Sequence, residues 1–229
     1  MWQLLFDLDG TILDTTELIM QSFIYAFANG LGQQVTREEL MTHFGRPLQD
    51  QFGLMRPDLP QSEIDRLIAI YREHNESEHD RWVTLVPGAD RVLRELASLG
   101  YPLGIVTSKR LDMTMQGLKL VGLDHLFSCI VHTGSTIYHK PRPEPIQHAL
   151  RLLGAVPATA IYVGDSPYDM AAGRAASVRT LGLVHNTFSD RDLRSSGADD
   201  VVYGWPEVLQ TLKQWTSACN PKPSVNQER

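Results

Sequence analysis

The chain has 229 residues, of which 42% are hydrophobic, and its 27 acidic and 21 basic side chains leave a formal net charge of −6. This length permits one large domain or a core domain with a smaller insert. The acidic balance argues against a nucleic-acid-binding surface, which would carry a basic patch, and no apolar segment approaches the length of a membrane span. The N-terminus lacks the basic and apolar regions of a signal peptide, and the cysteines show no metal or redox spacing. We therefore expect a cytoplasmic protein, kept reduced, that binds neither nucleic acid nor a membrane.

The first apolar run ends in two closely spaced carboxylates. Residues 4–6 predict a short buried strand of a parallel sheet, because the turn residues Gly10 and Thr11 soon follow. Ligands of open α/β sheets bind beyond the carboxyl ends of the strands, and alternate side chains of an extended chain point the same way. Asp7 and Asp9 could therefore reach one ligand together, and their mutual repulsion suggests a divalent cation between them. Taken alone, the motif fits a strand followed by an Asp-Gly turn equally well.

A helical block follows, from about residue 15 to residue 81. We expect helices at 16–28, at 37–44 and from 61 onward. The first would be capped near Thr15 and stopped at Asn29-Gly30, and the second would be capped by Thr36. The third is amphipathic, with one apolar face formed by Ile64, Leu67, Ile68 and Tyr71.

After residue 86 strands and helices alternate. Strands are predicted at 102–106, 129–131, 160–163, 180–184 and 201–203, and helices at 89–99, 111–121, 144–153 and 168–176. This alternation predicts βαβ units and an α/β fold with a Rossmann-like parallel sheet. We expect a core domain of residues 1–14 and 86–215, an inserted helical domain of residues 15–85 that acts as a lid, and a disordered tail of residues 216–229.

Three further loops after predicted strands carry polar groups. Thr107-Ser108-Lys109 could cradle a phosphate at a helix N-terminus, although such a motif is more often a simple helix cap. Two prolines, Pro141 and Pro143, restrict the backbone just after Lys140, although this segment could also be simply a rigid loop that enters a helix. Asp165 and Asp169 could bind a cation or merely cap the helix that starts between them.

Together, D-x-D-G-T, a Thr after the second core strand, K-P-x-P and G-D-x-x-x-D resemble the four motifs of the haloacid dehalogenase (HAD) superfamily of phosphohydrolases. The resemblance spans residues 3 to about 212 and implies the HAD fold, with the helical insert as a C1 cap. Within the superfamily, the chain resembles the phosphoglycolate phosphatase-like group. Segments such as 44–52 and 71–75 are most similar to the bacterial HAD-type inorganic pyrophosphatases.

The resemblance implies a role for each motif. Asp7 would be the nucleophile that forms an aspartyl-phosphate, and Asp9 would protonate the leaving oxygen and then activate water. Thr107 would donate to the transferred phosphoryl group, and Lys140 would neutralise Asp7 and the phosphoryl oxygens. Dehalogenases of the superfamily lack the second acid, so the presence of Asp9 favours phosphoryl transfer.

The resemblance also implies a Mg²⁺ site. Asp7, the backbone carbonyl of Asp9, and Asp165 would hold the ion, and Asp169 would orient the ligands around it. A phosphate dianion that approaches two carboxylates needs such a cation, and a lysine, before it is attracted at all.

The substrate would be a small phosphorylated molecule. Inorganic pyrophosphate is the first candidate, followed by phosphoglycolate or a broad range of phosphomonoesters, and the enzyme would be a monomer or homodimer. Residues expected to contact the substrate are Gly10, Thr11, Arg46, Ser108 and Lys109. Arg46, in a Gly-Arg-Pro break, could bind a second phosphate or a carboxylate with its guanidinium fork, or could lie in solvent. Three alternatives remain. One is a hexose-phosphate mutase with the same catalytic residues. The others are a non-catalytic binding module, which the intact motifs disfavour, and a structural α/β domain with coincidental loops, which the order of the four motifs disfavours further.

Overall fold

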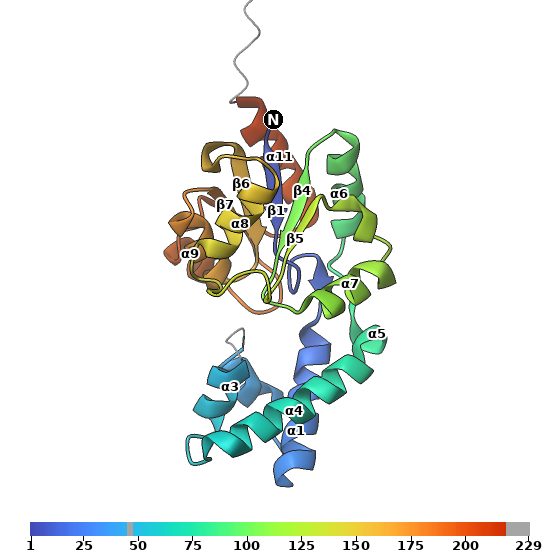
Figure 1. Cartoon of the computed structure of the whole chain (residues 1–229), viewed down its shortest axis with the longest axis vertical. Coiled ribbons are helices and arrows are strands. Elements are labelled where there is room, and N and C mark those ends of the chain that lie inside the picture. The colour runs from blue at the N-terminus through green and yellow to red at the C-terminus, as the bar shows by residue number, and fades with distance from the viewer. Residues whose placement is uncertain (45–47, 219–229) are drawn as a thin grey trace, which may run out of the picture.

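The computed structural model describes residues 1–44 and 48–218. Its centre is a parallel six-stranded sheet with the order β5-β4-β1-β6-β7-β8 (Figure 1). The strands are β1 (Gln3–Phe6), β4 (Leu103–Val106), β5 (Cys129–Val131), β6 (Ala160–Gly164), β7 (Arg179–Leu183) and β8 (Asp200–Val202). The predicted α/β fold is therefore confirmed, and β1 lies inside the sheet between β4 and β6.

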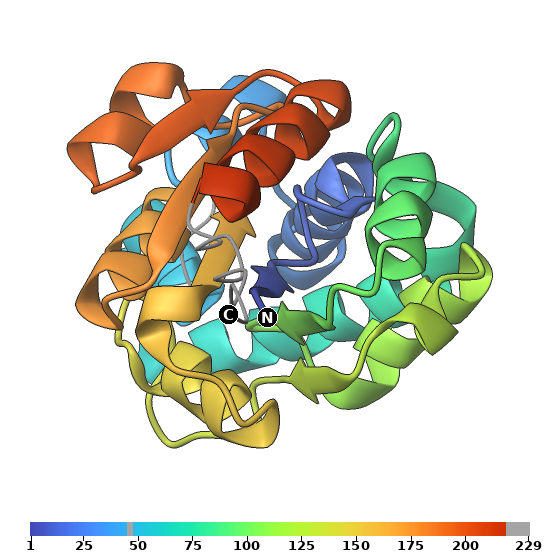
Figure 2. The same cartoon turned by 90° about the horizontal axis from the view of Figure 1, so that it is seen from above.

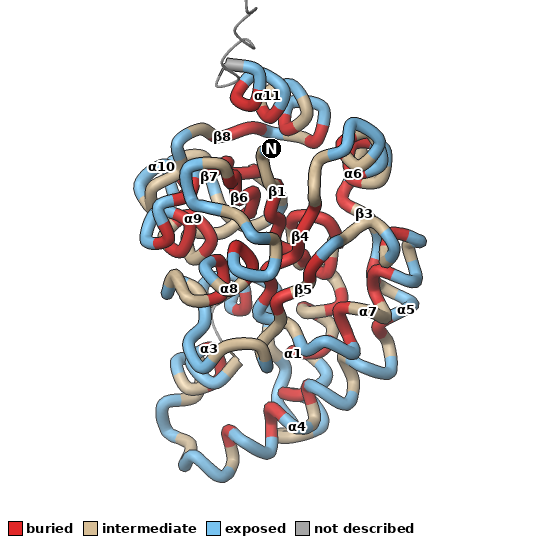
Figure 3. The backbone as a smooth tube through the Cα atoms, turned by 45° about the horizontal axis from the view of Figure 1, so that its top comes forward, coloured by how far each residue is buried: buried red, intermediate tan, exposed pale blue. Residues whose placement is uncertain are grey.

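Helices cover both faces of this sheet (Figure 2). They are α6 (Ala89–Ser98), α7 (Leu111–Leu120), α8 (Glu144–Leu152), α9 (Pro167–Ala175), α10 (Asp190–Ser195) and α11 (Trp205–Ala218), with short 3₁₀ helices at Asp124–Leu126 and Pro157–Thr159. Leu4 and Phe6 of β1 pack on the side of α6 and α11, while Leu5 packs on the side of α8. Successive side chains of a strand point to opposite faces, so β1 is buried on both (Figure 3).

A second group of helices lies beyond the carboxyl ends of the strands (Figure 1). We call it the helical unit: α1 (Thr16–Leu31), α2 (Arg37–Met41), α3 (Leu48–Met55), α4 (Gln61–Ser77) and α5 (His79–Trp82). It has an apolar core of its own, in which the ring of Phe23 lies 4.8 Å from that of Phe52 and 4.7 Å from that of Tyr71. The predicted apolar face of α4 is buried in this core.

Two short strands connect the helical unit to the sheet. β2 (Leu13–Asp14) leads into α1, and β3 (Thr84–Leu85) leads out of α5. The two pair antiparallel, with Leu13 opposite Leu85 and Asp14 opposite Thr84. No strand was predicted at either position, because two-residue strands carry no periodic signal. The pairing holds the entry and exit of the helical unit side by side.

The expected end of the first helix is wrong. α1 continues through Gly30 to Leu31 and ends where Gly32 adopts φ 66°, which a glycine tolerates without strain. Gly30 instead allows close packing, since a Cβ there would lie 2.4 Å from Cδ2 of Leu67 on α4. The second helix, α2, also ends earlier than expected, at Met41 rather than residue 44.

The predicted elements after residue 86 are confirmed to within one residue at each end, but α10 and α11 were not predicted. The expected disordered tail is wrong for residues 216–218, because α11 extends to Ala218 and the side chain of Thr216 is buried. Residues 219–229 lie outside the described part. Within residues 1–44 and 48–218, none of the helices is both long and apolar enough to cross a membrane.

Candidate active site

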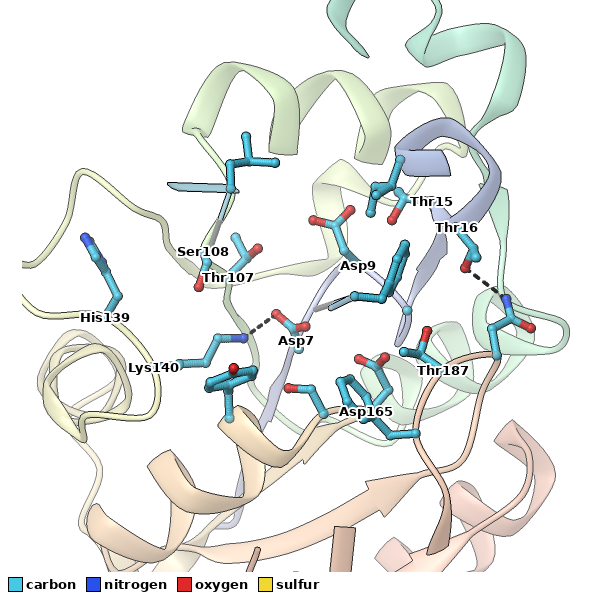
Figure 4. Close-up of a pocket in the computed structure, with 18 of the residues that line it drawn as sticks. Asp7, Asp9, Thr15, Thr16, Thr107, Ser108, His139, Lys140, Asp165 and Thr187 are labelled. Atoms are coloured by element: carbon cyan, nitrogen blue, oxygen red, sulfur yellow. Dashed lines mark hydrogen bonds and ion pairs between the residues drawn. The ribbon is translucent and has the colours of Figure 1, made fainter. Parts of the chain in front are cut away.

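A cavity of about 450 Å³ lies between the carboxyl ends of the sheet strands and the helical unit (Figure 4). Its sheet side brings together the four loops that the motifs singled out. Asp7 follows β1, Thr107 follows β4, Lys140 lies in the loop after β5, and Asp165 follows β6. Parallel strands place the loops at their carboxyl ends along one edge, so residues far apart in the sequence share one cavity.

The amino group of Lys140 connects two buried carboxylates. Its Nζ lies 2.7 Å from Oδ1 of Asp7 and 2.6 Å from Oδ1 of Asp169. Burial by itself lowers the pKa of Lys140, but the charges of Asp169 and Asp7 outweigh it and raise that pKa above its usual value. Lys140 therefore remains a cation at neutral pH.

Asp169 is fully buried, and both of its oxygens are engaged. Oδ1 accepts hydrogen bonds from Lys140 and from the hydroxyl of Tyr162, which lies 2.9 Å away. Oδ2 accepts from the backbone N–H and the hydroxyl of Ser166, at 3.0 and 2.6 Å, in the capping box that starts α9. Asp169 thus caps the helix and positions Lys140 at the same time, and it has little capacity left to bind a cation directly.

Asp7 and Asp165 each keep one oxygen free for a cation. Ligand atoms of Asp7, Asp165 and Asp169 lie within 4.8 Å of one another. Within the described residues, Oδ2 of Asp7 and Oδ2 of Asp165 accept no hydrogen bond. Burial, and the neighbouring carboxylates, raise the pKa of Asp7 to about 7 and hold that of Asp165 well above its usual range. One lysine does not balance three buried acids, and free carboxylate oxygens are the ligands that Mg²⁺ prefers, so the residues fit a divalent cation.

Two residues expected to contact the substrate, Thr11 and Lys109, bind carboxylates of the protein in the structure. Thr11 is fully buried, does not line the cavity, and donates to Oδ1 of Asp165 over 3.0 Å. Lys109 does not line the cavity either, and its Nζ lies 2.8 Å from Oδ1 of Asp9. Thr11 therefore orients Asp165 and Lys109 restrains Asp9, and neither side chain faces the cavity. Gly10 and Ser108 do line the cavity, and Arg46 lies outside the described residues.

The loop after β7, which was not predicted to belong to the site, forms another wall of the cavity. His185, Asn186 and Thr187 line it. Nδ2 of Asn186 donates to Oδ2 of Asp14 over 2.9 Å and to the hydroxyl of Thr16 over 3.0 Å. The hydrogen bond from His185, with those from Thr16 and Asn186, holds the pKa of Asp14 well below its usual range although partial burial opposes this. The loop thus binds the start of the helical unit, and only its position after a strand could have indicated it.

Gly10 is close enough to Asp165 to be tested by mutation. It has φ 81°, and a Cβ there would lie 2.2 Å from Oδ2 of Asp165. We expect Gly10→Ala to weaken Mg²⁺ binding about tenfold or more, measured by titration calorimetry, because the displaced carboxylate can no longer face the cation. Gly100→Ala is the matched control, since Gly100 has φ 83° but no neighbour within 4 Å. Both variants should lose about 1–2 kcal/mol of stability from the left-handed backbone. Equal Mg²⁺ affinities in the two would exclude this role of Gly10.

A family model described as haloacid dehalogenase-like hydrolase matches residues 4–183. The pyrophosphatase PpaX of Bacillus pumilus is 41% identical over 205 residues, which are 90% of this chain and 93% of the relative. The pyrophosphatase PpaX of Halalkalibacterium halodurans is 34% identical over 208 residues, covering 91% of this chain and 95% of the relative.

Solved structures show the same fold. A haloacid dehalogenase-like hydrolase of Streptococcus pneumoniae superposes with a TM-score of 0.82 at 27% identity, covering 93% of this chain and 98% of that one. A predicted phosphoglycolate phosphatase of Haemophilus somnus superposes with a TM-score of 0.84 at 23% identity, covering 92% and 97%. These alignments extend across the sheet and the helical unit alike.

Proposed function

Because the chain belongs to the haloacid dehalogenase-like hydrolase family, we propose that this phosphohydrolase requires Mg²⁺, works through an aspartyl-phosphate, and acts mainly on inorganic pyrophosphate. The proposal rests on the contacts of the Asp7 carboxylate and on its position in the cavity. Lys140 holds one of its oxygens at 2.7 Å, while the other accepts no hydrogen bond from the described residues and belongs to a side chain that lines the cavity. In this proposal the free oxygen would face the cation, and the oxygen beside Lys140, which keeps a lone pair, would attack phosphorus.

The proposed reaction has two steps. Asp7 attacks the phosphorus, the bond to the leaving oxygen breaks, and Asp9 gives that oxygen a proton. Asp9 then takes a proton from water, the water attacks the aspartyl-phosphate, and phosphate and free Asp7 are released. Lys109, 2.8 Å from Asp9, holds the carboxyl group that performs both proton transfers.

Two further groups contact the transferred phosphoryl group in this proposal. Lys140 neutralises charge on its oxygens, as it already does for Asp7. The hydroxyl of Thr107 accepts a hydrogen bond from the backbone N–H of Lys109 at 3.1 Å, so its own proton is free to be donated into the cavity.

The cation site rests on the same residues. Asp7, Asp165 and the backbone carbonyl of Asp9 would hold Mg²⁺, with Thr11 orienting Asp165. When bound, the ion would neutralise the phosphate oxygens as they approach the acidic cluster.

We further propose that residues 15–85 act as a cap over this site. The helical unit lies beyond the carboxyl ends of the strands (Figure 1). Its residues supply one side of the cavity. The paired strands β2 and β3 are its two connections. A cap of this kind excludes water while the aspartyl-phosphate is formed.

Pyrophosphate is the proposed substrate because the curated relatives at 34–41% identity are named pyrophosphatases. We expect kcat/KM for pyrophosphate to exceed that for 2-phosphoglycolate and glucose 6-phosphate by about tenfold or more, a difference of 1.4 kcal/mol in transition-state binding. Removal of Mg²⁺ with a chelator should abolish turnover, and added Mg²⁺ should restore it. The measurement is release of inorganic phosphate from each substrate.

Other outcomes would reassign the activity. A higher kcat/KM for 2-phosphoglycolate would make it the substrate. Conversion of a hexose phosphate into its isomer without phosphate release would identify a mutase. Full activity after thorough removal of divalent ions would exclude the proposed cation.

A further inference from the structure

The helical unit presents a mainly apolar surface to the cavity, with one cation in it. Between residues 15 and 85, the described residues that line the cavity are the apolar Ile19, Phe44, Leu48 and Ile68, the uncharged Thr15, Thr16 and Gln49, and Arg72. Arg72 is the one basic side chain among them. From this position, and on the basis of the function proposed above, we infer that Arg72 binds the end of the substrate that is not transferred and selects substrates in which that end is anionic.

The position of Arg72 on α4 directs it towards the cavity. Ile68 and Arg72 are four residues apart, so they lie on the same face of the helix, and both line the cavity. Tyr71 is buried in the core of the helical unit. Ile68 belongs to the buried face of α4 and also borders the cavity, so Arg72, one turn further along the helix, lies at the edge of that face beside the cavity.

Arg72 also differs from neighbouring arginines in having no partner within residues 1–44 and 48–218. Arg66, on the same helix, donates to Glu63 over 2.8 Å and to the carbonyl of Gly30 over 2.7 Å. Gln49, the other long polar side chain of this surface, donates to Asp65 over 3.0 Å. The guanidinium of Arg72 thus keeps its donors free for a ligand.

In this inference each side of the cavity binds one phosphoryl group of a diphosphate. Lys140 and Thr107 lie on the sheet side beside Asp7, so they contact the phosphoryl group that is transferred. The remainder of the substrate extends away from Asp7 and meets the helical unit. There Arg72 can bind a second phosphoryl group with two parallel hydrogen bonds. A neutral leaving group offers it nothing to bind.

The test compares substrates with charged and neutral leaving groups. For Arg72→Ala we expect KM for pyrophosphate to rise about 10- to 100-fold, the usual effect of losing a hydrogen-bonded charge pair. KM for 4-nitrophenyl phosphate should change less than about twofold. The inhibition constant of methylenediphosphonate, at constant free Mg²⁺, should rise with the KM for pyrophosphate. Arg72→Lys should retain part of the effect, because it keeps the charge but loses the fork.

Arg66→Ala is the matched control, because it removes a paired guanidinium from the same helix outside the cavity. It should leave both KM values and the inhibition constant unchanged. Equal changes for the two substrates in Arg72→Ala, or a loss in kcat alone, would overturn the inference.

Evidence against pyrophosphate as the substrate can be distinguished from evidence against the role of Arg72. The former would appear as wild-type enzyme that hydrolyses 4-nitrophenyl phosphate but not pyrophosphate. Methylenediphosphonate still decides the role of Arg72 in that case: weaker inhibition of Arg72→Ala supports it, and equal inhibition, or none in the wild type, excludes it.

Discussion

Replacement of Asp7 by asparagine is expected to lower kcat by about 10⁴-fold or more while the fold is retained. Asparagine has nearly the same shape, but its amide cannot attack phosphorus. The measurement is steady-state phosphate release, with circular dichroism as the test of folding. Asp58→Asn is the control, since Asp58 is an exposed carboxylate paired with Arg56, and it should keep wild-type activity. Near-normal hydrolysis by Asp7→Asn would remove Asp7 from the role of nucleophile.

The stability of Asp7→Asn relative to the wild type is expected to depend on pH. Burial raises the pKa of Asp7 from 3.8 to about 7, against the attraction of Lys140. Between these values the unfolded chain has lost the proton that the folded chain still holds, so ionisation of Asp7 destabilises the fold as pH rises. Asparagine cannot ionise. In Mg²⁺-free buffer, the Tm of Asp7→Asn minus that of the wild type should therefore increase from pH 4 to pH 7.

Replacement of Lys140 by methionine is expected to cost about 3–5 kcal/mol of stability near pH 8, the usual effect of leaving buried charges without a partner. Lys140 is only 7% exposed, and the side chains that it pairs, Asp7 and Asp169, are 10% and 0% exposed. The loss should be smaller near pH 5, where protonation of Asp7 removes one of the two charges. We also expect kcat to fall about 10²- to 10³-fold, because the phosphoryl oxygens lose a fixed cation.

Chemical denaturation at both pH values is the measurement for Lys140→Met. Lys213→Met is its control, because Lys213 makes an exposed ion pair with Glu95 at 2.6 Å, and such pairs contribute about 0–1 kcal/mol. Added Mg²⁺ should recover part of the stability of Lys140→Met, since a ligand that binds only the folded state stabilises it. Equal losses in both variants would show that Lys140 is not the counter-ion of the buried acids.

Local patterns in the sequence were sufficient for the strands that carry the motifs. Each apolar run of β1, β4, β5 and β6 stops at a polar loop, and burial on both faces of a parallel sheet requires such runs. Helix caps are equally local: the boxes at Thr36 and Ser166 depend on residues three positions apart. These signals were enough to place Asp7, Asp165 and Lys140 at one edge of a sheet.

The hydrogen-bond partners of the side chains at that edge could not be predicted from local patterns. Thr11 donates to Asp165 rather than to a ligand, Lys109 pairs with Asp9, and α11 is anchored by a hydrogen bond from Trp205 to the carbonyl of Thr11. These pairs join residues that are 154, 100 and 194 positions apart.

By itself, the sequence determined the class of fold, the order of the motifs and the acids that meet at the end of β1. Only the tertiary structure decided which oxygens remain free for a cation, and which arginine among the described residues of the helical unit lines the cavity without a partner. The physical reason is that strands, turns and caps follow from neighbouring residues, whereas the hydrogen-bond partner of a buried charge depends on which distant segments pack against it.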